Sequence, residues 1–82
     1  MAIDDESRLL IDIAFRDGSL VELAREYDGR GFDVAEALST EKTKVTAGQL
    51  NDFFKEREYG SFLGWYVDEI KARELAREYR KA

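Results

Sequence analysis

The longest helical pattern in the chain is SFLGWYVDEIKARELAREYR, which occupies residues 61–80. It contains no proline and begins with a serine, a residue type that is preferred at the N-cap of a helix. Its C-terminal end carries Arg77 and Arg80, and Lys81 follows directly. Basic side chains stabilise the negative end of a helix dipole. The sequence therefore predicts one long C-terminal helix over residues 61–80.

The apolar residues of this predicted helix fall on two nearly opposite sides when each residue turns by about 100°. One side carries Phe62, Leu63, Tyr66, Val67 and Ile70. The other side carries Trp65, Ala72, Leu75, Ala76 and Tyr79. A helix that packs once on a small core needs a single apolar stripe. The second side therefore either packs under the first helix of the chain or binds a partner. We expect it to be a protein-binding face, because Trp and Tyr are enriched among interface residues that carry binding energy.

Glycines divide the rest of the chain into shorter helical patterns, and proline is absent throughout. The predicted helices occupy approximately residues 4–17, 19–28, 33–38 and 46–58. No segment alternates between apolar and polar residues with period two, so we predict no sheet. A chain of 82 residues forms one domain. We predict an all-α fold in which residues 1–82 form a compact bundle of four to five short helices with a longer C-terminal helix.

Local patterns indicate where some of these helices begin and which sides they bury. Three residue pairs have the spacing of a capping box, namely Ser19/Glu22, Asp33/Glu36 and Thr46/Gln49. Two pairs are candidates for hydrophobic staples across a helix start, namely Phe32/Ala37 and Val45/Leu50. In the first helix, the expected buried stripe consists of Leu9, Leu10, Ile13 and Ala14.

The composition argues against an enzyme and against a metal site. The chain contains no Cys and no His, so the best nucleophile, the commonest general base and the main zinc ligands are absent. The carboxylate pairs Asp4/Asp5 and Asp68/Glu69 lie on predicted polar faces. No segment matches a calcium loop or a phosphate-binding loop. We therefore expect no catalysis, no cofactor and no metal.

No apolar run approaches the ~18 residues of a membrane span. The first residues also lack the basic and apolar regions of a signal peptide. From these two observations we expect a cytoplasmic protein that makes no membrane contact.

Charge is distributed unevenly along the chain. Residues 1–41 carry 11 acidic and 4 basic side chains, a net charge of −7, whereas residues 42–82 carry 7 acidic and 9 basic ones, a net charge of +2. The candidate acidic surface consists of Asp4, Asp5, Glu6, Asp12 and Asp17. Such a surface can attract a basic partner.

Three functional hypotheses follow. The first is a non-enzymatic protein-interaction module (an inhibitor, an adaptor or a regulatory subunit) that binds a protein partner or a second copy of itself through the C-terminal helix. The second is an acidic inhibitor that mimics DNA and occupies a nucleic-acid-binding site on a target protein. In being short, acidic and helical, the chain resembles small phage-encoded inhibitors. The third is a nucleic-acid-binding regulator that uses the basic C-terminal helix. We do not expect this, because Glu74 and Glu78 interrupt its basic residues at helical spacing.

Overall fold

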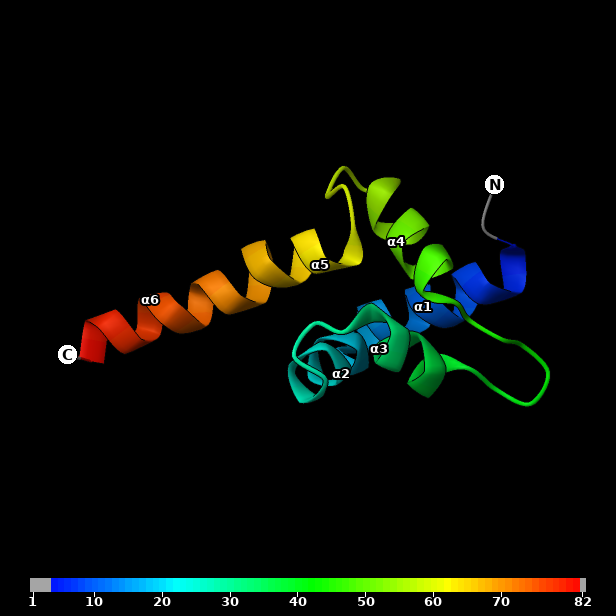
Figure 1. Cartoon of the computed structure of the whole chain (residues 1–82), viewed down its shortest axis with the longest axis horizontal. Coiled ribbons are helices and arrows are strands. Elements are labelled where there is room, and N and C mark those ends of the chain that lie inside the picture. Colours follow the sequence, from blue (N-terminus) through cyan, green and yellow to red (C-terminus); the bar gives the residue numbers. More distant parts are fainter. Residues whose placement is uncertain (1–3, 82) are drawn as a thin grey trace.

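Helices account for all the regular secondary structure in the part of the chain that the structure describes. The computed structural model describes residues 4–81, with side chains for residues 4–80. The elements are α1 (Asp5–Asp17), α2 (Ser19–Glu26), α3 (Gly31–Leu38), α4 (Ala47–Lys55), α5 (Phe62–Trp65), the π-helical η1 (Tyr66–Lys71) and α6 (Ala72–Lys81). The last three follow one another without a break and form one rod (Figure 1). The predicted all-α fold with a long C-terminal helix is therefore confirmed.

Several helix ends lie where the sequence places them. The Asp4 carboxylate accepts a hydrogen bond from the Ser7 backbone N–H at 2.9 Å and so caps α1, which ends at Gly18 with a left-handed φ of 87°. At the start of α4, Thr46 and Gln49 form both hydrogen bonds of the predicted capping box, at 3.1 and 2.9 Å. The Ser61 hydroxyl accepts from the Gly64 N–H at 2.9 Å and caps the final rod as expected.

Two predicted caps are wrong. At α2 the N-cap residue is Gly18, and Ser19 instead donates its N–H to the Asp17 carboxylate at 2.8 Å. Because Asp17 supplies this acceptor, the Ser19/Glu22 box does not form. Helix α3 begins at Gly31, two residues earlier than predicted, so Asp33 lies inside its first turn and pairs with the Arg30 guanidinium at 2.8 Å.

The two predicted staples have different outcomes. Val45 and Leu50 are both buried where the chain enters α4, as the staple between them requires. Phe32 is exposed and forms no staple, because the earlier start of α3 at Gly31 places it at the beginning of the helix.

An aromatic cluster joins the helices at the centre of the molecule. Phe54 on α4 stacks on Trp65 of α5 with ring centroids 4.5 Å apart, and the Phe15 ring of α1 meets Trp65 edge-on at 5.9 Å. Around them lie the apolar core residues Ile11, Leu20, Ala24, Val34, Phe53 and Phe62, all essentially inaccessible. Aromatic side chains bury the largest areas per residue. The cluster therefore gives this short chain a core without disulfide or metal.

The predicted buried stripe of α1 is wrong in part. Leu9 and Ile13 are exposed, whereas Ile11 and Ala14 are buried. The first helix is apolar on several sides, and its position is decided by Phe15, whose ring joins the aromatic cluster. The side that carries Leu9 and Ile13 consequently faces away from the core.

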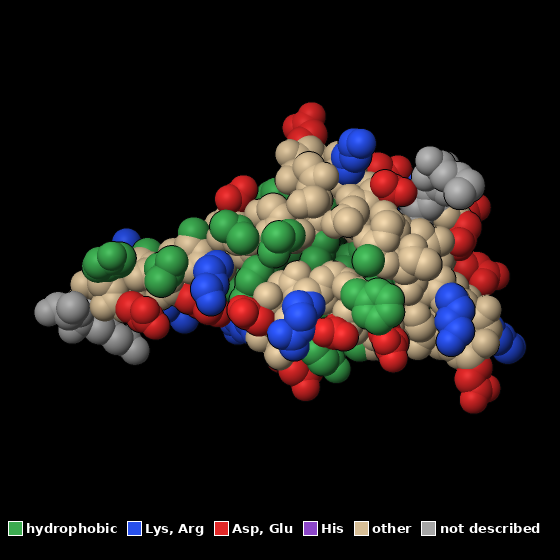
Figure 2. All heavy atoms as spheres, viewed as in Figure 1, with side chains coloured by type: hydrophobic (Ala, Val, Ile, Leu, Met, Phe, Trp, Pro, Cys, Tyr) green, Lys and Arg blue, Asp and Glu red, His purple; other side chains and the backbone are tan. Residues whose placement is uncertain are grey.

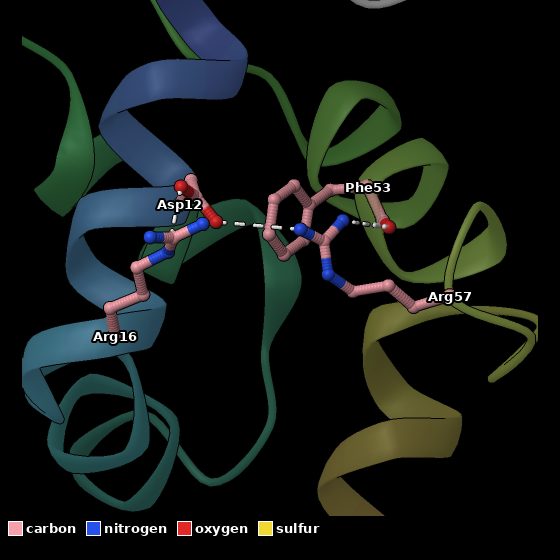
Figure 3. A network of polar contacts seen from close by, with 4 residues as sticks. All are labelled: Asp12, Arg16, Phe53 and Arg57. Carbon is pink, nitrogen blue, oxygen red and sulfur yellow. Dashed lines mark hydrogen bonds and ion pairs between the residues drawn. The ribbon is translucent and has the colours of Figure 1, made fainter.

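A polar contact network joins α1 to the end of α4 beside this core (Figure 3). The Arg57 guanidinium lies 3.7 Å from the centroid of the Phe53 ring and 3.4 Å from the Asp12 carboxylate. On the other side, Asp12 accepts from Arg16 at 3.0 Å. A cation over an aromatic face is attracted by the ring electrons. Asp12, which we predicted to belong to an acidic surface, is therefore already paired with two arginines.

The molecule is elongated, measuring 47 × 24 × 20 Å. Figure 1 shows the reason: the α5–η1–α6 rod starts against the other helices and then leaves them, on the side away from the N-terminal end of α1. Helices α5 and η1 pack on α4 and α2, respectively. Within the described residues, the only extensive packing of α6 is with η1. The predicted bundle therefore has a projecting C-terminal helix.

Candidate functional site

An apolar stripe runs along the rod. It consists of Leu63, Val67, Leu75 and Tyr79, which are 55%, 47%, 48% and 82% exposed. At the base of the rod, the Leu63 side chain also lies beside Gly29 in the α2–α3 turn. In Figure 2, hydrophobic side chains follow one another along the projecting helix on the face in view, with a basic side chain between them. We call these four residues the exposed stripe. Contiguous apolar patches of more than a few hundred Å² on a soluble protein often mark a site of interaction.

Trp65 does not belong to this surface, although we predicted it to be one of five binding residues. Only 3% of it is accessible, and it stacks on Phe54 inside the aromatic cluster. The other four residues of the prediction, Ala72, Leu75, Ala76 and Tyr79, are all exposed on α6. Sequence reasoning therefore assigned one core residue to the surface and did not include Leu63 and Val67 in it.

The π-helical turn of η1 explains both errors. The Ala72 N–H donates to the Val67 carbonyl, five residues earlier, so this turn holds one more residue than an α-helical turn. Residues beyond it lag by about 100° relative to a continuous α-helix. In a continuous α-helix, Leu75 would be rotated by about 80° from Val67, but after this lag it lies within about 20° of it. The π turn thus brings the two halves of the exposed stripe into line.

Two small residues form part of the flank of the stripe on α6. Ala72 follows Lys71 and Ala76 follows Leu75 by one residue, and both alanines are exposed. Gly64 lies where a Cβ would come within 2.8 Å of the Tyr59 carbonyl oxygen, so glycine is required there for the tight entry into the rod. Small side chains on the flank allow another helix to approach the stripe closely.

Charged and polar contacts fix the base of the rod against the α2–α3 turn. The Tyr66 hydroxyl donates to the Asp28 carboxylate at 3.0 Å, and Lys71 lies 3.6 Å from the same carboxylate. Farther along, Glu74 pairs with Arg25 of α2 at 3.0 Å. Burial of the Tyr66 phenol, together with the adjacent Asp28 carboxylate, raises its pKa above the usual 10.0. These contacts determine the direction in which α6 leaves the other helices.

The first helix does not cover the exposed stripe, which was the alternative to a binding face. Helix α1 packs on α2, α3 and α4, and the rod contacts it chiefly through the Trp65–Phe15 ring pair. The side of α6 that carries Leu75 and Tyr79 is consequently open.

No family model, curated protein or solved structure matches this chain. The assignment of a function therefore depends on the geometry of the surfaces alone.

The predicted acidic residues do not form one uniform negative face. Asp4 and Asp17 lie at the two ends of α1. The hydrogen bond from the Ser7 N–H lowers the pKa of the Asp4 carboxyl. Hydrogen bonds from the Ser19 hydroxyl and N–H lower the pKa of the Asp17 carboxyl. Asp12 is paired with arginines, as described above. Asp5 and Glu6 remain at the start of α1, where the Glu6 carboxylate accepts from the Thr43 hydroxyl at 2.9 Å.

A second surface feature is an open hollow of about 970 Å³ between α3 and the start of α4. Its walls are mostly apolar and include Phe32, Ala35, Val45 and Ala47, with Glu36 and Glu41 also lining it.

In residues 4–80 no group of three or more carboxylates is arranged to hold a metal ion. Among the helices described, none is long and apolar enough to cross a membrane.

Proposed function

We propose that this protein is a protein-interaction module whose binding surface is the exposed stripe of the projecting rod. The observation that carries the proposal is that Leu75 and Tyr79 are about half and four-fifths exposed, on a helix that extends beyond the core. Aromatic and leucine side chains at helical spacing are the usual anchors of a helix that binds through one face. A partner that covers them would remove a large apolar area from water, which is the main driving force of association.

The geometry of the rod adds to this support. The exposed stripe is aligned by the π turn, and the rod is held by Asp28 at its base and by the Arg25–Glu74 ion pair farther along. Fixing the direction of the rod before binding lowers the entropy cost of association. The acidic-inhibitor alternative has less support, because Asp12 is paired with two arginines and Asp17 lies at the opposite end of α1 from Asp4.

The direct test is photo-crosslinking from the stripe under native conditions. A photoreactive phenylalanine analogue at position 79 should give protein-linked products, since this side chain would lie inside the interface. The matched control carries the same analogue at position 9, because Leu9 is also an exposed apolar residue but lies on α1. We expect crosslinks from position 79 and few from position 9.

A pair of double variants completes the test. Added in excess as an unlabelled competitor, the chain with Leu75→Ser and Tyr79→Ser should suppress the crosslinks from position 79 at least tenfold less well than the wild type, while its circular dichroism spectrum is retained. Leu9→Ser with Ile13→Ser removes an apolar pair of the same i, i+4 spacing from α1, and this chain should compete as well as the wild type. Equal loss in both variants, or no crosslinks from position 79 to any protein, would contradict the proposal.

A further inference from the structure

We infer that the occupant of the exposed stripe is a second copy of this chain, with the two rods packed antiparallel about Lys71. The inference rests on the proposed function and names the partner. It begins from the spacing of the stripe. Leu63 and Val67 lie eight and four residues before Lys71, and Leu75 and Tyr79 lie four and eight residues after it. Lys71 itself lies in the middle of the same line, because the π turn of η1 between Val67 and Lys71 completes nearly one full rotation about the helix axis.

This spacing is symmetric, which is what a two-fold interface requires. In an isologous dimer the same surface of both copies forms the interface. If one residue of the first copy contacts a second residue of the other copy, the reverse contact also forms, so the surface must be complementary to itself. With an axis at Lys71, Leu63 of one copy lies opposite Tyr79 of the other, and Val67 lies opposite Leu75. The two most exposed residues of the stripe then meet each other, as do the two least exposed ones, and all four apolar side chains are covered at once.

Charge favours the antiparallel over the parallel arrangement. At the far end of α6, Arg77 and Arg80 with Glu78 between them give a net charge of +1, whereas the base of the rod adjoins Asp28 on the acidic half of the chain. Antiparallel rods place the basic end of one copy beside the acidic base of the other. Parallel rods would place the two basic ends together, and like charges that face each other destabilise a complex.

The two Lys71 side chains meet near the axis and would repel each other if their charges faced inward. The Lys71 ammonium instead reaches 3.6 Å from the Asp28 carboxylate of its own chain. Long lysine stems cover apolar surface while their charged ends point aside to an acidic group or to water. Each lysine can therefore contribute its methylenes to the interface with its charge compensated.

The area available indicates a reversible dimer. The surface of one chain is 5826 Å². We estimate that the stripe with its alanine flank buries on the order of 500 Å² per copy, of which the aromatic ring supplies the largest part. Stable interfaces bury about 800 Å² per partner, and a total near 1,000 Å² corresponds to the low end of specific association. Dimerisation should therefore depend on concentration in the micromolar range.

The first experiment measures mass in solution. Sedimentation velocity of the full chain at concentrations from about 1 to about 500 µM should show a monomer–dimer equilibrium, with the dimer dominant at the upper end. Tyr79→Glu should shift the midpoint at least tenfold toward monomer. Leu9→Glu, on α1, should leave it unchanged. A monomer at every concentration would overturn the inference.

The second experiment tests the antiparallel arrangement. Because the chain contains no native cysteine, every disulfide must join the introduced residues. A disulfide needs Cα atoms about 4.4–6.8 Å apart. Lys71→Cys should give a disulfide-linked dimer on mild oxidation. Tyr79→Cys alone should not form a disulfide-linked dimer, since position 79 of the second copy would lie at the opposite end of the interface. A mixture of Leu63→Cys and Tyr79→Cys chains should form the disulfide-linked mixed dimer. Ready crosslinking of Tyr79→Cys to itself would overturn the antiparallel arrangement.

A third variant keeps every apolar side chain but rotates half of the stripe. Insertion of one alanine between Ala72 and Arg73 turns Leu75 and Tyr79 by about 100° away from Val67. The helix should persist and dimerisation should be lost; an unchanged dimer would overturn the alignment argument.

If the chain is monomeric but position 79 still crosslinks to a different protein, the second copy is excluded and the proposed function stands. If position 79 crosslinks to nothing, both fail.

Discussion

Phe54 and Trp65 stack nearly parallel, with ring planes 19° apart and centroids 4.5 Å apart. This contact joins α4 to the base of the rod and lies at the centre of the aromatic cluster. Trp65 is therefore one attachment of the rod to the other helices, and its ring also lies 5.9 Å from Phe15 and 5.8 Å from Phe62.

Replacing Trp65 by alanine should remove this attachment. Loss of a buried aromatic side chain costs about 3–5 kcal/mol of unfolding free energy, a large share of the 5–15 kcal/mol that is typical of a domain. Tyr79→Ala, on the exposed end of the same rod, should change the unfolding free energy by less than about 0.5 kcal/mol. Urea denaturation of dilute protein measures both. Equal costs for the two variants would contradict the placement of Trp65 in the core.

Gly29 should tolerate alanine less well than Gly18, although both have left-handed φ angles, of 77° and 87°. An added Cβ at Gly29 would lie 2.6 Å from the Tyr66 ring, whereas nothing lies within 4 Å of one at Gly18. Alanine at either position carries the backbone cost of about 1–2 kcal/mol, and the clash at Gly29 adds about 1–3 kcal/mol. Thermal denaturation of the two single variants measures this difference. Similar costs would show that Tyr66 can move aside.

Stability should fall at alkaline pH in a way that depends on Tyr66. The folded protein holds the phenol proton more tightly than the unfolded chain, because burial and Asp28 raise the pKa of this group above 10.0. Between the unfolded and folded pKa values, the folded state binds more protons, so the unfolding free energy decreases as pH rises. The stabilisation is fully present below about pH 10 and is lost as pH passes through the folded pKa.

Tyr66→Phe is the control for this effect. It loses the hydrogen bond to Asp28, worth about 1 kcal/mol at neutral pH, and it has no phenol to ionise. Urea midpoints measured from about pH 8 to about pH 11 should therefore fall more steeply in the wild type than in the variant. Parallel curves would show that the phenol titrates alike in the folded and unfolded chains.

Local patterns were sufficient to predict most of the fold. Helix starts that depend on residues three apart, such as Thr46 and Gln49, are confirmed because the cap is complete within one turn. Helix α2 begins at Ser19 as predicted, but the capping boxes at Ser19 and Asp33 are wrong. Residues just outside the pattern, Asp17 and Arg30, bind these two side chains instead. Capping motifs compete with such neighbours for the same donors.

The candidate site was predicted only in part, for a different reason. The predicted faces assume a continuous α-helix, whereas the single π turn at η1 shifts everything beyond it by about one residue. Trp65 was consequently grouped with Leu75 and Tyr79, from which it is separated in the structure. No residue type in the segment from Tyr66 to Lys71 distinguishes a π turn from an α turn. The error could not have been avoided from spacing alone.

The projection of α6 past its neighbours has a consequence for how the chain moves. Within the described residues its extensive packing is with η1 alone, and tertiary packing supplies most of the stability of a helix in a protein. Backbone amides near Tyr79 should therefore open locally and exchange their hydrogens with solvent far sooner than those of α4. Any molecule that settles on this end would also complete its helix, so slowed amide exchange there would reveal occupancy before the occupant is identified.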